Sequence, residues 1–343
     1  PQYRERGRLL GLYNNHYALS LEPAGQLEVS IVPKENLRTI QRIYESFLRQ
    51  IRPLLARRRW RLVTLGYQPK SRAEELPLIP KRRYEYMDAY FKRSGTCGRN
   101  MMRGTAATQV SIDYCSEEDF LRKYRAAYLL MPALKLLTDN TPVFEGRPCE
   151  GHLTRTGIWD RVDPARCGMI PGTFRSGFGF RAYGEYLWRL PLIFLPSPEG
   201  GVYTGSRTTA ELFQDRLLTT GDIEHILSMT FLDVRLKHYL EIRGADSMPF
   251  GYVMAYLALI KGIFFHREVL EKLLAQYPVK EEDIRLAEAS LAEKGFDGTI
   301  YGQKAASFLR ELLELAESRL DDNEGICLLP FRQNVSRQAT EKF

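Results

Sequence analysis

The sequence predicts an α+β protein with a largely antiparallel sheet, whose apolar face packs against helices while the other face stays open. Several short segments alternate apolar and polar residues, as strands buried on one face do. Fully buried parallel strands would instead read as near-continuous apolar runs. Segments with helical periodicity separate these strands, and a C-terminal region at about 251–320 is almost wholly helical. No repeat or linker divides the chain.

The N-terminal part predicts a hairpin followed by a long helix. Residues 18–32 contain two alternating segments around a turn at Ala24 and Gly25, which indicates two antiparallel strands. An apolar stripe at helical spacing comes next. It consists of Leu37, Ile40, Ile43, Tyr44, Phe47, Ile51 and Leu54.

Two further strands and a second long helix are expected before residue 134. Residues 61–67 predict a strand, and the proline-rich segment 68–87 predicts a loop leading into a short helix. Residues 109–114 predict another strand. Ser116 is a candidate N-cap, because Asp119 follows three residues later in a capping-box pattern.

The remaining elements surround a long irregular stretch. Residues 134–178 are rich in proline and glycine, and so long a loop in a compact domain usually builds a functional site. A helix over 179–189, an apolar strand over 190–195 and a surface loop near Gly200 should follow. The expected C-terminal helices cover 251–265, 280–294 with a stop at Gly295, and 304–320.

Residues 233–246, DVRLKHYLEIRGAD, alternate so regularly that they predict one strand with two unlike faces. One face is apolar except for a histidine, and the other is almost wholly charged. The charged face could look at solvent or at a bound, highly charged ligand. The apolar set is Val234, Leu236, His238, Leu240 and Ile242, and the charged set is Asp233, Arg235, Lys237, Tyr239, Glu241 and Arg243.

Two other predicted strands also carry one polar face. It holds Glu28 in QLEVSI and Gln109 in TQVSIDY, while Glu22 lies just before the hairpin turn. If these strands are neighbours at a spacing of about 5 Å, their carboxylates converge and repel one another. Bound Mg²⁺ would relieve that repulsion, and nearby cations would suit phosphate or carboxylate oxygens. The converging groups are Glu22, Glu28 and Glu241, and the cations are Arg235, Lys237 and Arg243.

A solvated sheet face with cross-strand ion pairs explains the same pattern, and the pattern alone favours this reading. The charge of the chain does not decide between the two. Lys and Arg number 49 against 42 Asp and Glu, which is a mixed surface with a basic excess of +7. A nucleic-acid-binding protein would more often concentrate its cations, whereas the one clear basic cluster here is ARRRWRL at 56–62. An anionic small substrate explains the excess equally well.

The cysteines and the apolar runs indicate a compartment. Five cysteines without a C-x-x-C pair argue against a disulfide framework and against structural zinc, so the cytoplasm is expected. The longest apolar run, 249–265, contains Lys261 and predicts a core helix rather than a membrane span. Because the chain starts at Pro1 without methionine, we expect residues upstream of it.

Eight stretches in a fixed order identify a family. They are SLEPAGQLEVS (20–30), GYQPK (66–70), IPKRRYEYMDAYF (79–91), MMRGTAATQVSIDY (101–114), EGRPCEGHLTRTGIWD (145–160), DPARCGMIP (163–171), FGFRAYGEYLWRLPLIF (178–194) and VRLKHYLEIRGADSMP (234–249). In this order they resemble the glutamate–cysteine ligases of the plant and proteobacterial type, over nearly all of residues 20–320. Each stretch is weakly specific alone, but the ordered set is highly specific.

The resemblance implies a glutamine synthetase-like fold, with a curved antiparallel sheet that forms an open funnel and helices on its outer face. It implies one catalytic domain over 1–343. The implied reaction is the first step of glutathione synthesis: ATP phosphorylates the γ-carboxylate of L-glutamate, and the amine of L-cysteine displaces the phosphate. Mg²⁺, or Mn²⁺ in its place, would be the cofactor, with ATP as co-substrate. No nucleic-acid or membrane partner is expected, and the oligomeric state stays open.

The resemblance also implies roles for individual residues. Glu22, Glu28 and Glu241 fall in metal-binding motifs, and Arg155 and Arg243 match arginines that hold glutamate. Gln109 would be a polar contact on the same floor. Arg235 and Lys237 are candidates for the ATP phosphates by strand face, with a structural ion pair as the alternative. Trp159 and Tyr183 either line the pocket or belong to the core.

The chain departs from the family pattern at several places. The family's first motif, an N-terminal glycine followed by closely spaced metal-binding glutamates, is absent from the sequence. Gly104-Thr105 stands where the family commonly has Arg-Thr, with Arg103 one place earlier. A family aspartate is replaced near Arg189, and the loop after Pro198 is short. Two alternatives therefore stay open, a related carboxylate–amine ligase with another amine acceptor and a non-catalytic homologue. The basic excess and the ARRRWRL cluster leave a third, a nucleic-acid-binding protein.

Overall fold

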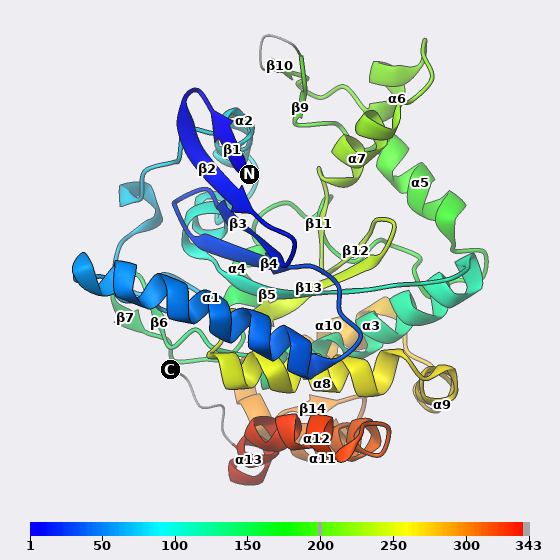
Figure 1. The fold of residues 1–343 in the computed structure, drawn as a ribbon. Coiled ribbons are helices and arrows are strands. Elements are labelled where there is room, and N and C mark those ends of the chain that lie inside the picture. Colours follow the sequence, from blue (N-terminus) through cyan, green and yellow to red (C-terminus); the bar gives the residue numbers. More distant parts are fainter. Residues whose placement is uncertain (198–200, 339–343) are drawn as a thin grey trace.

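The computed structural model describes residues 1–197 and 201–338, which form a mixed α+β fold with several antiparallel sheets. The predicted class is confirmed. A small sheet, β12–β13–β5, lies at the centre of the molecule, with helices below it and the N-terminal sheet above it (Figure 1). Hydrogen bonding divides the described strands into separate sheets rather than one continuous curved sheet. The surface loop expected near Gly200 lies outside the described residues.

The N-terminal sheet is an antiparallel meander of β1 (Gln2–Glu5), β2 (Arg8–Tyr13), β3 (Tyr17–Leu21) and β4 (Leu27–Ile31). The hairpin predicted over 18–32 is therefore confirmed. Gly25 closes its turn with φ +86°, a conformation that favours glycine. The predicted helix follows as α1 (Leu37–Arg57), which begins where the Asn36 side chain accepts the Thr39 N–H.

The segment 233–246 is a hairpin rather than the single strand that alternation predicted. It consists of β12 (Val234–Leu236) and β13 (Leu240–Asp246), which are antiparallel. Leu236 pairs with Leu240 across a three-residue turn, so the even-numbered residues that pair across this turn lie on the same face of the sheet. His238, expected in the apolar set, lies exposed in this turn. The third strand, β5 (Ala107–Ile112), pairs with β13.

The apolar face of this sheet is buried against helices α3 (Glu117–Leu137) and α8 (Phe250–Phe264) (Figure 1). Val234, Leu240 and Ile242 are completely buried there. Each such side chain contributes about 1.5–3 kcal/mol when it leaves water. The apolar run at 249–265 is thus the predicted core helix, and in the described part of the chain no helix has the length and apolarity to cross a bilayer.

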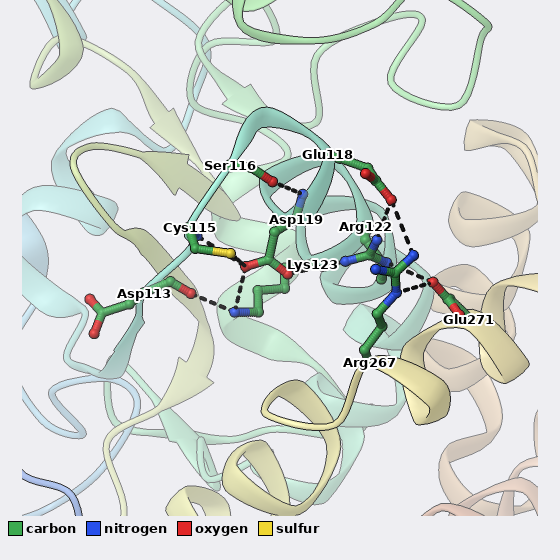
Figure 2. A network of polar contacts seen from close by, with 9 residues as sticks. All are labelled: Asp113, Cys115, Ser116, Glu118, Asp119, Arg122, Lys123, Arg267 and Glu271. Atoms are coloured by element: carbon green, nitrogen blue, oxygen red, sulfur yellow. Dashed lines mark hydrogen bonds and ion pairs between the residues drawn. The ribbon is translucent and has the colours of Figure 1, made fainter.

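The N-terminus of α3 is held by a polar network that also reaches α9 (Arg267–Gln276) (Figure 2). Ser116 caps the helix by accepting the Asp119 N–H, as the sequence predicted. Arg122 pairs with Asp119 at 3.2 Å and with Glu271 of α9 at 3.4 Å. Because Glu271 is half exposed, these pairs fasten the helix ends rather than form a binding site.

Two predicted strands are largely absent, and the long loop contains a helix. Residues 61–66 form no strand, because the Gly66 N–H bonds to the Asn140 carbonyl and only Tyr67 forms a bridge, with Thr105. In the segment 190–195, only β9 (Phe194–Leu195) is a strand, paired with β10 (Val202–Tyr203). The irregular stretch 134–178 includes the end of α3 and the short helix α4 (Thr154–Trp159).

The other elements complete one packed unit, in which a continuous cluster of buried apolar side chains runs from Leu37 to Val335. The predicted helices at 179–189, 251–265, 280–294 and 304–320 all have counterparts in the structure. The remaining elements are η1 (Ala73–Glu75), α2 (Arg82–Phe91), η2 (Asn100–Gly104), β6 (Val143–Phe144), β7 (Arg147–Pro148), β8 (Cys167–Gly168), α5 (Phe180–Arg189), α6 (Thr209–Phe213), α7 (Thr220–Leu227), β11 (Phe231–Leu232), α10 (Glu281–Lys294), η3 (Gly295–Asp297), β14 (Thr299–Ile300), β15 (Gln303–Lys304), α11 (Ala305–Glu317), α12 (Asp322–Gly325), η4 (Ile326–Leu328) and α13 (Leu329–Arg337).

Candidate active site

Glu241 lies at the centre of the polar face of the β12–β13–β5 sheet, surrounded by three cations. The hairpin register places Arg235 of β12 directly opposite Glu241 of β13. Arg235 Nη2 lies 2.7 Å and Arg243 Nη1 2.6 Å from Glu241 Oε2. Lys237 Nζ lies 2.9 Å from Oε1. The carboxylate is only 6% exposed, so these contacts operate where water screens charge poorly.

The cluster holds three cations around one carboxylate, and the pKa values of Glu241 and Arg235 are shifted in it. Burial by itself would raise the pKa of Glu241, but Arg243, Arg235 and Lys237 together lower it to about 2. Burial and the charge of Arg243 lower the pKa of Arg235 to about 10, although Glu241 opposes this change. The charged form of Glu241 is thus strongly stabilised, whereas the charged form of Arg235 is destabilised. Three cations and one carboxylate carry a formal charge of +2, which suits an anionic ligand.

Two more carboxylates reach this face from the N-terminal sheet. Glu22, beside the β3–β4 turn, accepts a 3.0 Å hydrogen bond from the Tyr84 hydroxyl. Glu28 of β4 accepts one at 3.1 Å from Ser30. Burial raises the pKa of Glu28, and Glu22 and Glu241 raise it further, whereas Arg243 lowers it. These interactions place the three predicted glutamates in one electrostatic environment, although they come from sheets that share no hydrogen bonds.

The donor set partly fits a divalent cation. Over residues 1–197 and 201–338, no three His, Cys, Asp or Glu side chains form a ready-made metal site. Glu28 nevertheless is a largely desolvated carboxylate beside a like charge, and its hard oxygens suit Mg²⁺. Glu241 differs, because cations already bond both of its oxygens. A metal ion at Glu241 would have to share these oxygens with the cations or displace one of them.

Arg155 of α4 lies beside Arg243, beneath an irregularity in β13. The pairing of β13 with β5 shifts between Ile242 and Ala245. Arg155 donates to the carbonyl oxygens of Gly244 at 3.2 Å and Arg243 at 3.3 Å. Its pKa is lowered by burial, and the charge of Arg243 lowers it further. The two arginines predicted to hold one substrate are therefore close enough to repel each other.

The other predicted site residues divide between the two faces. Gln109 is exposed on β5 and has the same parity as Ser111, which pairs with Glu241, so it lies on the polar face. The Trp159 ring lies 5.8 Å from the Arg155 guanidinium. Tyr183 is 1% exposed on the apolar side, where its hydroxyl accepts the Leu236 N–H at 3.1 Å. Burial raises the pKa of Tyr183 to about 12, which fits its core alternative.

Two buried residues that contact this site, Tyr84 and Asp246, were not among the predicted site residues. Tyr84, in the stretch IPKRRYEYMDAYF, is 5% exposed and bonds Glu22. Asp246, in EIRGAD, is also 5% exposed and lies 3.9 Å from Arg155. Both belong to the quoted motifs, but nothing in their spacing indicates a partner. That signal exists only in three dimensions.

Comparison with known proteins then identifies the family. Residues 9–323 match the family model described as glutamate-cysteine ligase family 2. The chain belongs to glutamate-cysteine ligase family 2. This confirms the resemblance carried by the eight stretches over 20–320.

Curated relatives of this glutamate-cysteine ligase family 2 member include plant proteins named glutamate–cysteine ligase, chloroplastic. The Brassica juncea protein is 34% identical over 278 residues, which cover 79% of this chain and 54% of that protein. The Arabidopsis thaliana protein is 34% identical, with 79% and 53% covered. The Medicago truncatula protein is 31% identical over 330 residues, with 92% and 64% covered. The chain therefore spans between about half and two thirds of the length of these relatives.

Proposed function

We propose that this chain catalyses the ATP-dependent ligation of L-glutamate to the amine of L-cysteine, giving γ-glutamylcysteine, the first step of glutathione synthesis. The observation that carries the proposal is the buried cluster around Glu241, whose formal charge of +2 lies next to Arg155 and Glu28. Family membership adds support, since the relatives named above are glutamate–cysteine ligases. Both substrates of the first step, glutamate and ATP, are anions that such a cluster would attract.

In the first step, a γ-carboxylate oxygen of glutamate attacks the γ-phosphorus of ATP. The bond from that phosphorus to the bridging oxygen breaks, ADP leaves, and γ-glutamyl phosphate forms. Arg155 and Arg243 hold the glutamate, because guanidinium forks pair with carboxylates in a fixed orientation. Arg235 and Lys237 lie on the same face and neutralise phosphate oxygens, which is the main protein contribution to phosphoryl transfer.

In the second step, the amine nitrogen of cysteine attacks the acyl carbon. The carbon–oxygen bond to phosphate breaks, inorganic phosphate leaves, and the amine nitrogen loses a proton. Gln109 and the face of Trp159 are candidates for the substrate contacts, as the family resemblance implies. Exclusion of water would favour this step, because water that reached the acyl phosphate would hydrolyse it.

Glu22 and Glu28 would hold Mg²⁺, or Mn²⁺ in its place, together with Glu241 if its cations share or release an oxygen. The ion would neutralise charge on the oxygens of the transferred phosphoryl group. Tyr84 would hold Glu22 in place for this role by its 3.0 Å hydrogen bond to Oε2.

We further propose that the N-terminal and central sheets form the walls of the funnel implied by the family. The electrostatic interaction of Glu28 with Glu241 supports this arrangement, because it links the two sheets across the polar face. On this proposal residues 1–343 act as one catalytic domain in the cytoplasm. Its partners are small molecules, without nucleic acid or membrane.

The test is an assay of ADP release by the purified chain with Mg²⁺, ATP, glutamate and a panel of amines. We expect ADP only when glutamate and cysteine are both present, with γ-glutamylcysteine identified by mass spectrometry. ADP release with another amine but not with cysteine would make the chain a ligase with a different acceptor. Absence of ADP release with every amine would make it a non-catalytic homologue.

A further inference from the structure

Asp246 ends β13 as a buried carboxylate directed at Arg155. Its Oδ2 accepts hydrogen bonds from the Thr141 hydroxyl at 2.7 Å and from the Asn140 N–H at 3.0 Å. Its Oδ1 lies 3.9 Å from Arg155 Nη1. One oxygen therefore fixes the carboxylate to the 140–141 segment, while the other presents its charge to the guanidinium.

We propose that Asp246 is a positioning residue that orients the Arg155 guanidinium for the carboxylate of the substrate. This inference rests on the proposed function for the identity of that substrate. Among the charges acting on Arg155, Asp246 is the strongest opposite one, whereas Arg243 repels it. A separation of 3.9 Å is too long for a hydrogen bond, so Asp246 acts through its charge in a poorly screened interior.

Among residues 1–197 and 201–338, the direct hydrogen bonds of Arg155 go to backbone carbonyls only. Both are long, at 3.2 Å to the Gly244 carbonyl and 3.3 Å to the Arg243 carbonyl. Its Nε is buried, with no hydrogen-bond partner in the part of the chain that the structure describes. The unpaired Nε leaves the guanidinium with one donor that the described fold does not use, so its orientation depends on the charge of Asp246 as well as on these two bonds.

Asp246 is itself rigidly clamped, as a positioning residue must be. A Cβ atom at Gly66 would lie 2.1 Å from Asp246 Oδ2 and 2.4 Å from Thr141 Oγ1, so only glycine lets this segment close over the carboxylate. The Gly66 N–H donates to the Asn140 carbonyl at 2.8 Å. Two segments far from Asp246 in sequence, at Gly66 and at 140–141, thus converge to fix it, and such outer partners hold a binding side chain in its working orientation.

The effect should fall on glutamate and not on ATP. Arg155 bonds the backbone carbonyl of Arg243, so its position also bears on the second arginine expected to hold glutamate. Arg235 and Lys237, the candidates for ATP, lie on the other side of Glu241 and make no contact with Asp246 among the described residues. Loss of the Asp246 charge should therefore weaken the binding of glutamate but not that of ATP.

The experiment replaces Asp246 by asparagine, which keeps the volume and one acceptor for Thr141 and Asn140 while removing the charge. We expect the KM for glutamate to rise about tenfold, with kcat and the KM for ATP within about twofold, because a contact with a non-reacting carboxylate contributes equally to ground and transition states. The matched control is Glu324→Gln, a buried carboxylate paired with Lys261 at 2.8 Å and remote from this face, which should leave all three constants unchanged. An unchanged glutamate KM in Asp246→Asn, or an equal rise in both KM values, would overturn the proposal.

A second readout does not depend on the proposed function. The chain has three tryptophans, so Trp60→Phe with Trp188→Phe leaves Trp159, 5.8 Å from Arg155, as the sole tryptophan. In this background we expect Asp246→Asn to shift the Trp159 emission and Glu324→Gln to leave it unchanged. If the wild-type chain releases no ADP, the proposed function is refuted, but the emission measurement still tests whether Asp246 positions Arg155. An unshifted emission would still show that Asp246 does not position Arg155.

Discussion

Replacing Glu241 by glutamine removes the negative charge to which Arg235, Lys237 and Arg243 are all bonded on the sheet face. The variant leaves three buried or half-buried cations with no carboxylate between them. We expect a folded protein of reduced stability that has lost most of its ATP turnover. The structural and functional consequences can be measured separately.

The size of the stability loss follows from the pKa of Glu241, which the fold lowers from 4.5 to about 2. That difference corresponds to roughly 3 kcal/mol of unfolding free energy. Removing one partner of a buried ion pair typically costs about 3–5 kcal/mol, which agrees. Because the folded pKa is depressed, this contribution is complete above pH 4.5 and is lost as the pH falls toward 2.

The assay is urea unfolding of the wild type and of Glu241→Gln at pH 7 and again at pH 3. The difference in unfolding free energy should be about 3 kcal/mol at pH 7 and distinctly smaller at pH 3, because the carboxyl of the unfolded wild-type chain is then largely protonated and must lose that proton on folding. The control Glu324→Gln removes a different buried carboxylate and should retain ATP turnover. An unchanged free energy of unfolding at pH 7 would refute the electrostatic argument. Near-normal turnover at saturating Mg²⁺ would refute the catalytic one.

Three further variants test other parts of the site. Arg243→Lys should raise the KM for glutamate about tenfold, because a point charge cannot replace a guanidinium fork, and an unchanged KM would count against that role. Glu28→Gln should raise the Mg²⁺ concentration for half-maximal activity about tenfold if Glu28 is a ligand. The same variant should leave the unfolding free energy at pH 7 unchanged or higher. The pKa of Glu28 is raised in the folded state, so ionised Glu28 destabilises the fold once the pH exceeds its ordinary pKa. A clear loss of unfolding free energy would contradict this expectation. Tyr84→Phe should cost about 1 kcal/mol in urea unfolding through the lost bond to Glu22, and a difference below about 0.3 kcal/mol would show that the bond contributes nothing.

Part of the fold was predictable because it depends on local pattern. The capping pair Ser116 and Asp119 marked the start of α3 correctly, since an N-cap is satisfied within one helical turn. The strand predicted at 61–67 failed for a non-local reason. Its backbone at Gly66 bonds to Asn140 and packs against Asp246, contacts that β-propensity cannot anticipate.

The candidate site was predictable as a set of residues but not as an arrangement. Motif order pointed to Glu28, Arg155 and Glu241 together. The sequence left open whether Arg235 and Lys237 form ion pairs and whether Tyr183 belongs to the core, and the structure shows the ion pairs with Glu241 and the burial of Tyr183. Residue type and spacing indicate which side chains have unusual chemistry, whereas the partner of each depends on chain segments far away in sequence.

The sequence by itself determined the α+β class, the one-sided polarity of the central strands and the family of the chain. Periodicity encodes burial directly, because a side chain that alternates in sequence alternates between the two faces of a sheet. Only the tertiary structure decided that residues 233–246 turn back as a hairpin and place Arg235 opposite Glu241. A three-residue turn preserves parity, so one strand and two strands share the same pattern. Pairing across the turn therefore had to be seen in three dimensions.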